Sequence, residues 1–172
     1  MAVTRLITLD DAVPLARLVR ANREYLAPWF PVQNGAYFTE VGQREVLARD
    51  LARHEQGEML PLAILDAQGA VCGRINLNSI IRGAFQSASV GYWVSQSHAG
   101  RGLASAAAAE AVDVAFTGLG LHRVDAATLL HNTPSQRVLA RNGFRPFAVA
   151  EAYLKIAGKW QDHILFQLLN KD

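Results

Sequence analysis

Apolar and polar positions follow two different periods along this chain, which indicates a protein built from helices and strands. In the first half, helical spacing predicts one helix from Asp10–Asp11 to about Tyr25 and a second over about Thr39–Gln56. Between them, Leu26–Pro31 contains two prolines and predicts a rigid turn. Alternating and β-branched runs predict strands at Val3–Thr8, Leu60–Asp66, Val71–Ile80 and Ser87–Ser95.

The second half of the chain interleaves strands with helices. An alanine-rich helix follows the loop that ends at Leu103 and runs to about Thr117, where Gly118 and Gly120 stop it. A shorter helix begins at Asn132 or Thr133 and ends near Gly143. Strands are predicted at Arg123–Leu130, Phe144–Ile156 and Trp160–Leu169. The order β-α-α-β-β-β-α-β-α-β-β predicts an α/β protein with a mixed sheet and helices on its faces.

Composition narrows the class of protein. The 172 residues, 51% hydrophobic and 19% charged, suit one globular domain over residues 1–172. Seventeen Lys plus Arg against fifteen Asp plus Glu give a charge of only +2, so we expect no DNA partner. Arg17, Arg20 and Arg23 lie on one helix face. A solvated face is the simpler interpretation, and contact with an acidic substrate or RNA is the alternative.

The single cysteine and the apolar segments limit location and metal chemistry. Cys72 has no partner for an intrachain disulfide, and a cysteine-rich zinc site is excluded. The first residues lack the pattern of a signal peptide, and the longest apolar stretch, near Ala104–Ala109, is interrupted by Glu110 and Asp113. We therefore expect a cytoplasmic protein that binds no metal and no membrane. Whether it acts alone or as a homodimer stays open.

The most informative motif lies between a strand and a helix. It reads His98-Ala99-Gly100-Arg101-Gly102-Leu103-Ala104. Glycines allow tight turns, and the first N–H groups of the following helix have no intrahelical partners, so together they suit a pyrophosphate. A NAD-type fold is disfavoured because Ser105 occupies the third small-residue position and no acid ends the next strand. A Walker loop is excluded because no Gly-Lys-Ser/Thr occurs.

A second motif begins the shorter helix. Asn132 and Ser135 lie three residues apart, on the same side of its first turn. Taken alone, Asn132 is explained as a helix cap, and Pro134 occupies a position that prolines prefer. The motif gains meaning only in combination with the loop before the alanine-rich helix.

With both motifs in place, the chain resembles the GNAT acetyltransferase superfamily, and within it the RimJ/RimL-type ribosomal-protein-alanine N-acetyltransferases. The resemblance covers almost the whole chain and is carried by Asn22–Trp29, Gly73–Asn76, Ile81–Phe85, Gly91–Leu103, His131–Phe144 and Tyr153–Leu165. It implies a central, mostly antiparallel sheet in which two parallel strands, Ser87–Ser95 and Arg123–Leu130, splay apart. Acetyl-coenzyme A would lie between them.

The resemblance also implies roles for single residues. The cofactor would contact Trp93, Val94, Asn132, Ser135 and the loop residues His98, Ala99, Gly100, Arg101, Gly102, Leu103 and Ala104. An N–H group near Trp93–Val94 would polarise the thioester carbonyl, Ser135 would protonate the departing thiolate, and Asn132 would contact the cofactor. Cys72 is expected to be a buried structural thiol.

Two departures from the family pattern affect the chemistry. Ser97 replaces a frequent Gln or Arg, which leaves His98 or Arg101 to supply the positive charge. Phe147 occupies the place where relatives often carry a glutamate, a candidate general base. A water relay to Glu151, His131 or His163 is an alternative. Trp29, Tyr92 and Glu151 are candidate substrate contacts, although aromatic residues are more often plain core.

The missing glutamate bears on the acceptor. An α-amino group is roughly one-quarter neutral at pH 7.4, whereas a lysine amine is only about 0.1% neutral. We therefore expect direct acetylation of an α-amine, most naturally a peptide or protein N-terminus of the ribosomal-protein type. The alternatives are a small amine such as an antibiotic, and a coenzyme A-binding module without turnover.

Overall fold

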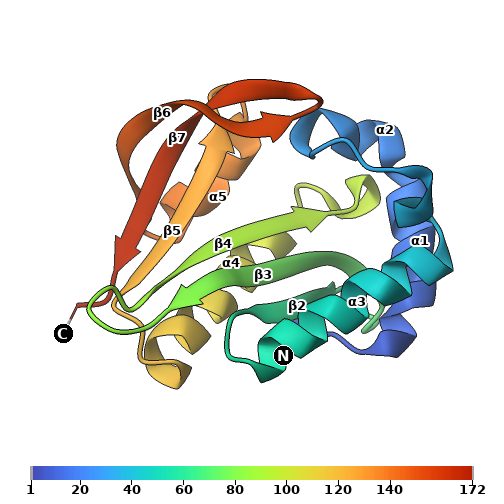
Figure 1. Ribbon diagram of the computed structural model, residues 1–172, viewed down its shortest axis with the longest axis horizontal. Coiled ribbons are helices and arrows are strands. Elements are labelled where there is room, and N and C mark those ends of the chain that lie inside the picture. The colour runs from blue at the N-terminus through green and yellow to red at the C-terminus, as the bar shows by residue number, and fades with distance from the viewer. Residues whose placement is uncertain (1, 172) are drawn as a thin grey trace.

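The computed structural model describes residues 2–171 and places its strands in one seven-stranded sheet (Figure 1). The strands are β1 (Thr4–Leu6), β2 (Leu60–Leu65), β3 (Val71–Ile81), β4 (Ser87–Val94), β5 (Arg123–Leu129), β6 (Arg145–Ile156) and β7 (Lys159–Leu169). Their order is β1-β2-β3-β4-β5-β7-β6, and β4 and β5 form the parallel pair among antiparallel neighbours. The predicted α/β fold with a mixed, mostly antiparallel sheet is confirmed.

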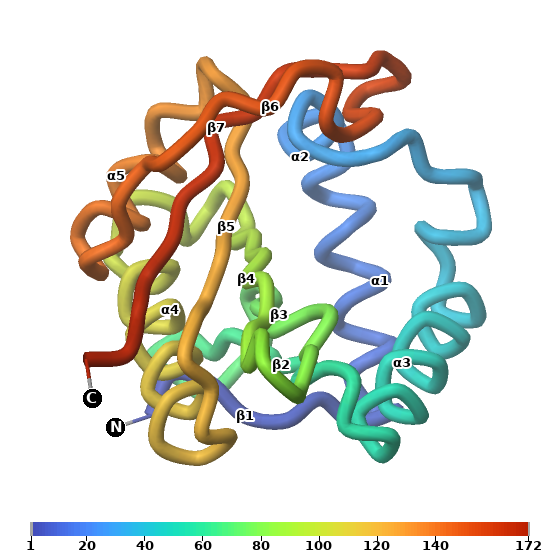
Figure 2. The backbone as a smooth tube through the Cα atoms, turned by 60° about the vertical axis from the view of Figure 1, so that its left-hand side comes forward, coloured from blue at the N-terminus to red at the C-terminus, as the bar shows by residue number. Residues whose placement is uncertain are grey.

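Helices cover both faces of this sheet (Figures 1 and 2). They are α1 (Ala12–Ala21), α2 (Arg23–Leu26), α3 (Glu40–Glu55), α4 (Leu103–Asp113) and α5 (Thr133–Arg141). The larger core cluster lies on the face of α4 and α5, where Ile75, Val124 and Phe166 meet Ala107 and Leu139. A smaller cluster packs α1 and α3 against the other face. Within residues 2–171, no helix has the length and apolar character needed to cross a membrane.

The first predicted helix is interrupted, and the reason is a contact far away in the sequence. Helix α1 ends at Ala21 instead of continuing to Tyr25, and a separate short helix, α2, begins at Arg23. Between them, the buried Asn22 side chain donates to the Leu18 carbonyl at 2.8 Å and accepts the Gln96 amide at 2.8 Å. Asn22 thus ties the end of α1 to the loop that follows β4.

Other boundaries differ from the predictions by a few residues. The rigid turn is a short 3₁₀ helix, Ala27–Trp29, and a second one, Gly35–Phe38, was not predicted. The alanine-rich helix is α-helical only to Asp113 and closes with a π-helical turn over Val114–Gly118. The predicted first strand, Val3–Thr8, is shorter, because β1 pairs with β2 only over Thr4–Leu6.

Candidate active site

The central feature of the site is the divergence of β4 from β5. The two strands pair only from Ser87↔Arg123 to Ser89↔Asp125. Beyond this point, β4 stays paired with β3 up to Val94, and β5 stays paired with β7 up to Leu129. The predicted splayed pair is therefore present, and the facing edges of both strands carry backbone groups that do not pair with each other.

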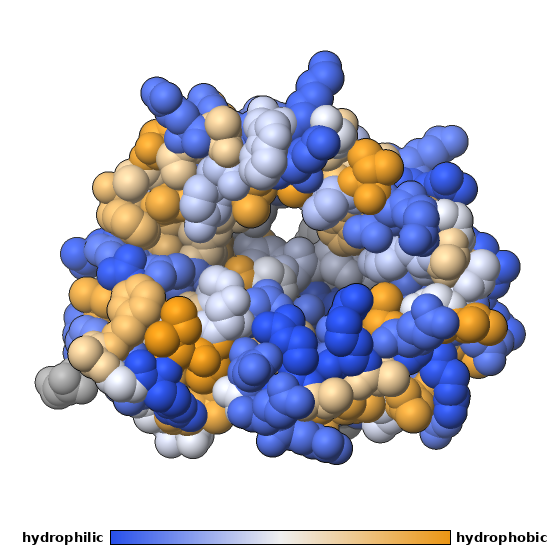
Figure 3. Space-filling model, viewed as in Figure 1, coloured by the Kyte–Doolittle hydropathy of each residue, from blue (hydrophilic) through white to orange (hydrophobic). Residues whose placement is uncertain are grey.

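A cleft of about 410 Å³ occupies this divergence. Both strands line it, together with α2, the loop before α4 and the start of α5. In the view of Figure 3 the face carrying α1 and α3 is hollowed at its centre, so that the upper part of the molecule arches over the opening. The arch is closed by a hydrogen bond of 2.8 Å from the Ala157 amide, in the β6–β7 turn, to the Phe30 carbonyl.

Most of the predicted site residues line this cleft, and some do not. Those that line it are Trp29, Tyr92, Trp93, Val94, Ala99, Gly100, Ala104, Asn132 and Ser135. His98, Arg101, Gly102, Leu103 and Glu151 do not. Glu151 is exposed on β6, in the irregular stretch between Ala150 and Leu154, outside the cleft lining.

The loop before α4 has the backbone conformation that the glycine motif predicts. Gly100 and Gly102 adopt φ values of 75° and 80°, which residues with a side chain rarely adopt. Their Cα atoms face open space, since a Cβ atom at either position would have no neighbour within 4 Å. The first hydrogen bond of α4 runs from Ala106 to the Gly102 carbonyl, so the preceding N–H groups at this helix start are free of intrahelical partners.

His98 is held by side chains on both sides of its ring. Its Nδ1 atom lies 2.8 Å from the Ser95 hydroxyl and 3.0 Å from the Ser97 hydroxyl, and its Nε2 lies 3.4 Å from Asp66. Backbone amides of Ala70 and Gln68, and then His98, hold the pKa of Asp66 below its usual value. The ring thus anchors the loop to the β2–β3 turn. Arg101, which is exposed, is the remaining cation of the motif.

At the start of α5, Asn132 and Ser135 are brought together with Tyr92. The Asn132 side chain accepts the Ser135 amide at 3.3 Å and so caps the helix. The Ser135 hydroxyl lies 2.9 Å from the Tyr92 hydroxyl, which is also 3.2 Å from the Ser135 carbonyl. Burial raises the pKa of Tyr92 to about 12, although its bond to Ser135 opposes this shift.

Tyr92, a candidate substrate contact, makes a second contact that was not predicted. It lines the cleft with Trp29, and its side chain lies on the α4–α5 face, where it joins Ser135. The next residue, Trp93, points to the opposite face and packs edge-on against Phe30 at 6.3 Å between ring centroids. Alternation along β4 separates these two neighbours, and no sequence signal identified Ser135 as the partner of Tyr92.

Cys72 is a structural thiol, as predicted. It is fully buried in the larger core cluster, and burial raises its pKa to about 11. A thiol in this state is a poor nucleophile, because the thiolate is the reactive form. Within residues 2–171, His, Cys, Asp and Glu side chains do not gather into a group of three that could hold a metal ion.

Comparison with known proteins identifies the family. The acetyltransferase (GNAT) domain family matches residues 3–145. Probable N-acetyltransferase YjcK of Bacillus subtilis is 34% identical over 98% of this chain and 93% of its own length. The [ribosomal protein uS5]-alanine N-acetyltransferase of Escherichia coli is 32% identical over 99% of this chain and 88% of its own.

Solved structures agree with this assignment. The ribosomal-protein-S5-alanine acetyltransferase of Vibrio fischeri superposes with a TM-score of 0.93 at 34% identity, covering 98% of this chain and 93% of its own. Mycobacterium smegmatis RimJ, in complex with CoA-disulfide, superposes with a TM-score of 0.93 at 33% identity, covering 96% of this chain and 80% of its own. This chain belongs to the GNAT acetyltransferase family and is an N-acetyltransferase with ribosomal-protein-alanine N-acetyltransferases among its relatives.

Proposed function

We propose that this protein transfers the acetyl group of acetyl-coenzyme A to the α-amine of a peptide or protein N-terminus. The observation that carries the proposal is the cleft between β4 and β5, which joins the glycine loop before α4 to the Ser135–Tyr92 pair at α5. The named activities of the relatives, acetylation of ribosomal proteins at alanine, support an N-terminal acceptor.

The residues of the cleft fit the substrate acetyl-coenzyme A. The pyrophosphate would bind at the free amides of Gly100–Ala104, because a helix start attracts anions, and Arg101 adds a positive charge nearby. The pantetheine arm carries amide groups. These can pair with the edge of β4 that β5 leaves free after Ser89, in the manner of an added strand.

The chemistry is direct attack of the amine on the thioester within a ternary complex. An N–H group of β4 near Trp93 and Val94 would stabilise the oxyanion that develops on the carbonyl. Ser135 would give its proton to the departing thiolate. Tyr92, which remains protonated up to very high pH because its pKa is about 12, lies 2.9 Å from Ser135 and would replace that proton.

An α-amine is the acceptor that this cleft suits best. Phe147, which stands where relatives often carry a glutamate, is half exposed on β6 and does not line the cleft. The cleft lining contains neither a carboxylate nor a lysine or arginine. An α-amino group is roughly one-quarter neutral at pH 7.4 and needs much less help than a lysine amine to lose its proton.

A second acceptor class, a small amine, is favoured by one observation. The Ala157–Phe30 hydrogen bond closes an arch over the cleft, so an acceptor must pass beneath the arch instead of lying across an open groove. The extended end of a polypeptide can thread through such an opening, whereas a folded surface cannot. A short free amine meets no such limit.

Steady-state acetylation separates these possibilities. The full chain is incubated with acetyl-coenzyme A and one acceptor in each of three parallel reactions. The acceptors are an unstructured Ala-initiated peptide, the same peptide with a blocked N-terminus and one internal lysine, and spermidine. We expect turnover of the first peptide alone. Turnover of spermidine alone would replace the peptide acceptor with a small amine, and tight binding of coenzyme A without any turnover would indicate a binding module.

A further inference from the structure

His163 is the one basic side chain among the residues that line the cleft. It lies on β7, is 3% exposed, and pairs in register with Leu129, the last residue of β5. The other titratable side chains of the cleft lining are phenols, Tyr25 and Tyr92. A side chain that can accept a proton from an amine inside the cleft must therefore be His163.

The hydrogen bond made by His163 determines which ring nitrogen is free. Its Nδ1 atom lies 2.9 Å from the carbonyl oxygen of Gln161. Because a carbonyl oxygen only accepts, Nδ1 carries the proton of this bond, and the neutral ring keeps its lone pair on Nε2. The bond also fixes the orientation of the ring.

Nε2 is accessible and has no hydrogen-bond partner among the described residues. The side-chain polar atoms that are sealed from solvent without a partner are Arg74 Nε and Thr128 Oγ1, and Nε2 of His163 is not among them. No bond to this atom forms within residues 2–171, and His163 lines the cleft, so the lone pair of Nε2 is free to accept a proton. The nearest aromatic neighbour is Tyr153 on β6, with 5.7 Å between ring centroids.

The two candidates considered beside His163 do not line the cleft. Glu151 is exposed on β6. His131 is exposed and packs against the Trp29 ring at 5.4 Å between centroids, without lining the cleft itself. The carboxylate of Asp162, next to His163 in sequence, accepts the Ala152 amide at 2.8 Å on the exposed side of the hairpin.

His163 and Ser135 lie on opposite faces of the sheet, at the same end of β5. Phe166 and Ile164 of β7 pack into the core beneath α4 and α5, so alternation turns His163 toward the face of α1 and α3. Ser135 starts α5 a few residues after Leu129, on the other face. A thioester held between the splayed strands would have a proton acceptor on one side and a proton donor on the other.

We propose that Nε2 of His163 is the general base of the acetyl transfer, acting directly or through one water. The amine nitrogen forms a bond to the thioester carbon and gives one proton to Nε2. The carbon–sulfur bond breaks, and the sulfur takes a proton from Ser135, so the products are the amide and the free thiol. This proposal rests on acetyl transfer to an amine, whichever molecule carries that amine.

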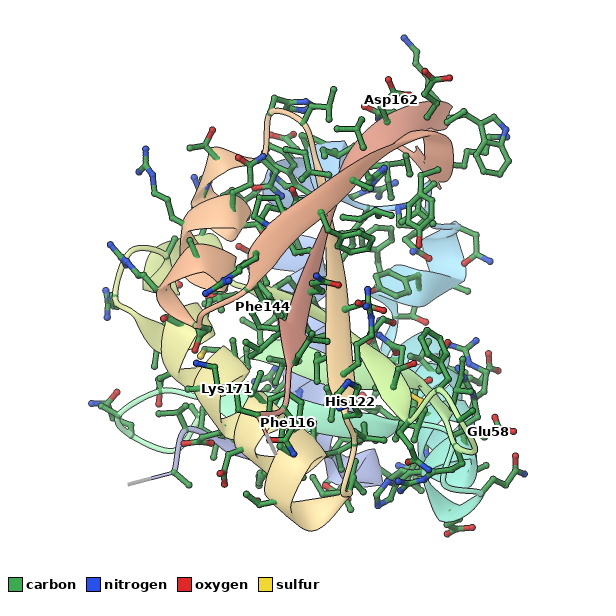
Figure 4. All side chains as sticks on the ribbon, turned by 90° about the vertical axis from the view of Figure 1, so that its left-hand side faces the viewer. Glu58, Phe116, His122, Phe144, Asp162 and Lys171 are labelled. Atoms are coloured by element: carbon green, nitrogen blue, oxygen red, sulfur yellow. The ribbon has the colours of Figure 1, made fainter. Side chains whose placement is uncertain are left out.

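The test uses two substitutions that remove the basic ring nitrogen and differ in shape. Asparagine can still donate to the Gln161 carbonyl from about the position of Nδ1, and glutamine places an amide near the position of Nε2. His163→Asn and His163→Gln are compared with His122→Asn as a matched control. His122 is exposed and precedes β5, at the end of the molecule opposite to Asp162 (Figure 4).

The readout is kcat/KM for an Ala-initiated peptide and for its aminooxy analogue, a much weaker base that is neutral at the assay pH. Both His163 variants should lose about 10²-fold or more with the peptide, in the range of general-base catalysis. They should lose far less with the aminooxy analogue, keep the wild-type KM for acetyl-coenzyme A, and match the melting temperature of His122→Asn.

Three results would overturn the assignment. The first is a wild-type kcat/KM in both His163 variants, and the second is an equal loss with both acceptors, which would indicate a structural role. The third is that the wild type turns over no amine. If the wild type acetylates spermidine but no peptide, the N-terminal acceptor fails. The same His163 variants are then measured with spermidine, where the predicted loss of about 10²-fold supports His163 and wild-type activity refutes it.

Discussion

Gly73 controls how closely β3 approaches β4, and its replacement by alanine tests whether this contact holds the cleft in shape. A Cβ atom at residue 73 would overlap the Trp93 carbonyl oxygen and lie 2.9 Å from the Val94 Cα atom, closer than real Cβ atoms approach their neighbours. Both opposing atoms belong to backbone, so no flexible side chain can move aside. The strands would have to separate at the β4 segment that lines the cleft.

The expected cost follows from overpacking. Inserting one methyl group into a filled interior destabilises a protein by about 1–3 kcal/mol. For a chain of this size, each kcal/mol corresponds to about 2–4 °C in melting temperature. We therefore expect Gly73→Ala to melt about 2–12 °C lower than the wild type. Because Trp93 and Val94 move with β4, the dissociation constant of the Gly73→Ala protein for coenzyme A should also rise.

The assay pairs thermal unfolding with calorimetric titration of coenzyme A. Gly35→Ala is the matched control, since Gly35 has no positive φ and a Cβ atom added there would meet no other atom within 4 Å. This control should change neither the melting temperature nor the affinity. If Gly73→Ala behaves like Gly35→Ala in both measurements, the close approach of β3 and β4 does not shape the cleft.

Three further predictions concern single groups. Ser135→Ala should lower kcat by about 10²-fold and weaken coenzyme A binding much less, and an unchanged kcat would remove Ser135 from the mechanism. Cys72, with its pKa raised to about 11 by burial, should react with a thiol reagent only in denaturant; stoichiometric labelling of the native protein would contradict its burial. For Asp11, burial favours a raised pKa, but hydrogen bonds from Arg5 and the Thr8 amide outweigh it and lower the pKa. In urea unfolding, the wild type should therefore have a larger free energy of unfolding than Asp11→Asn at pH 5–8, and the difference should decrease as the pH falls below about 4. A difference that persists at low pH would refute the lowered pKa.

The order of elements and the position of the cleft were predictable because they depend on local patterns. The glycine loop and the capped start of α5 are local motifs, and the resemblance to the GNAT superfamily connected them. The interruption at Asn22 could not be predicted, because it depends on a bond to Gln96, 74 residues away. The same holds for the contact of His98 with Asp66, which lies 32 residues earlier in the chain.

The catalytic groups were the least predictable part of the site. The sequence allowed Tyr92 to be aromatic core or a substrate contact, and only the pairing of β4 decides that it meets Ser135. The sequence left Glu151, His131 and His163 open as ends of a water relay. The bulge in β6 between Ala150 and Leu154 leaves Glu151 exposed, whereas β7 carries His163 into the cleft. Such choices depend on strand register, which one sequence alone does not reveal.

The most direct test of the proposed function is mass spectrometry of ribosomal proteins after incubation with the enzyme and isotopically labelled acetyl-coenzyme A. The proposal predicts label on the α-amine of one or a few N-termini, and loss of that label with Ser135→Ala. Label confined to lysine side chains, or an absence of labelled protein together with acetylation of a small amine such as spermidine, would contradict it.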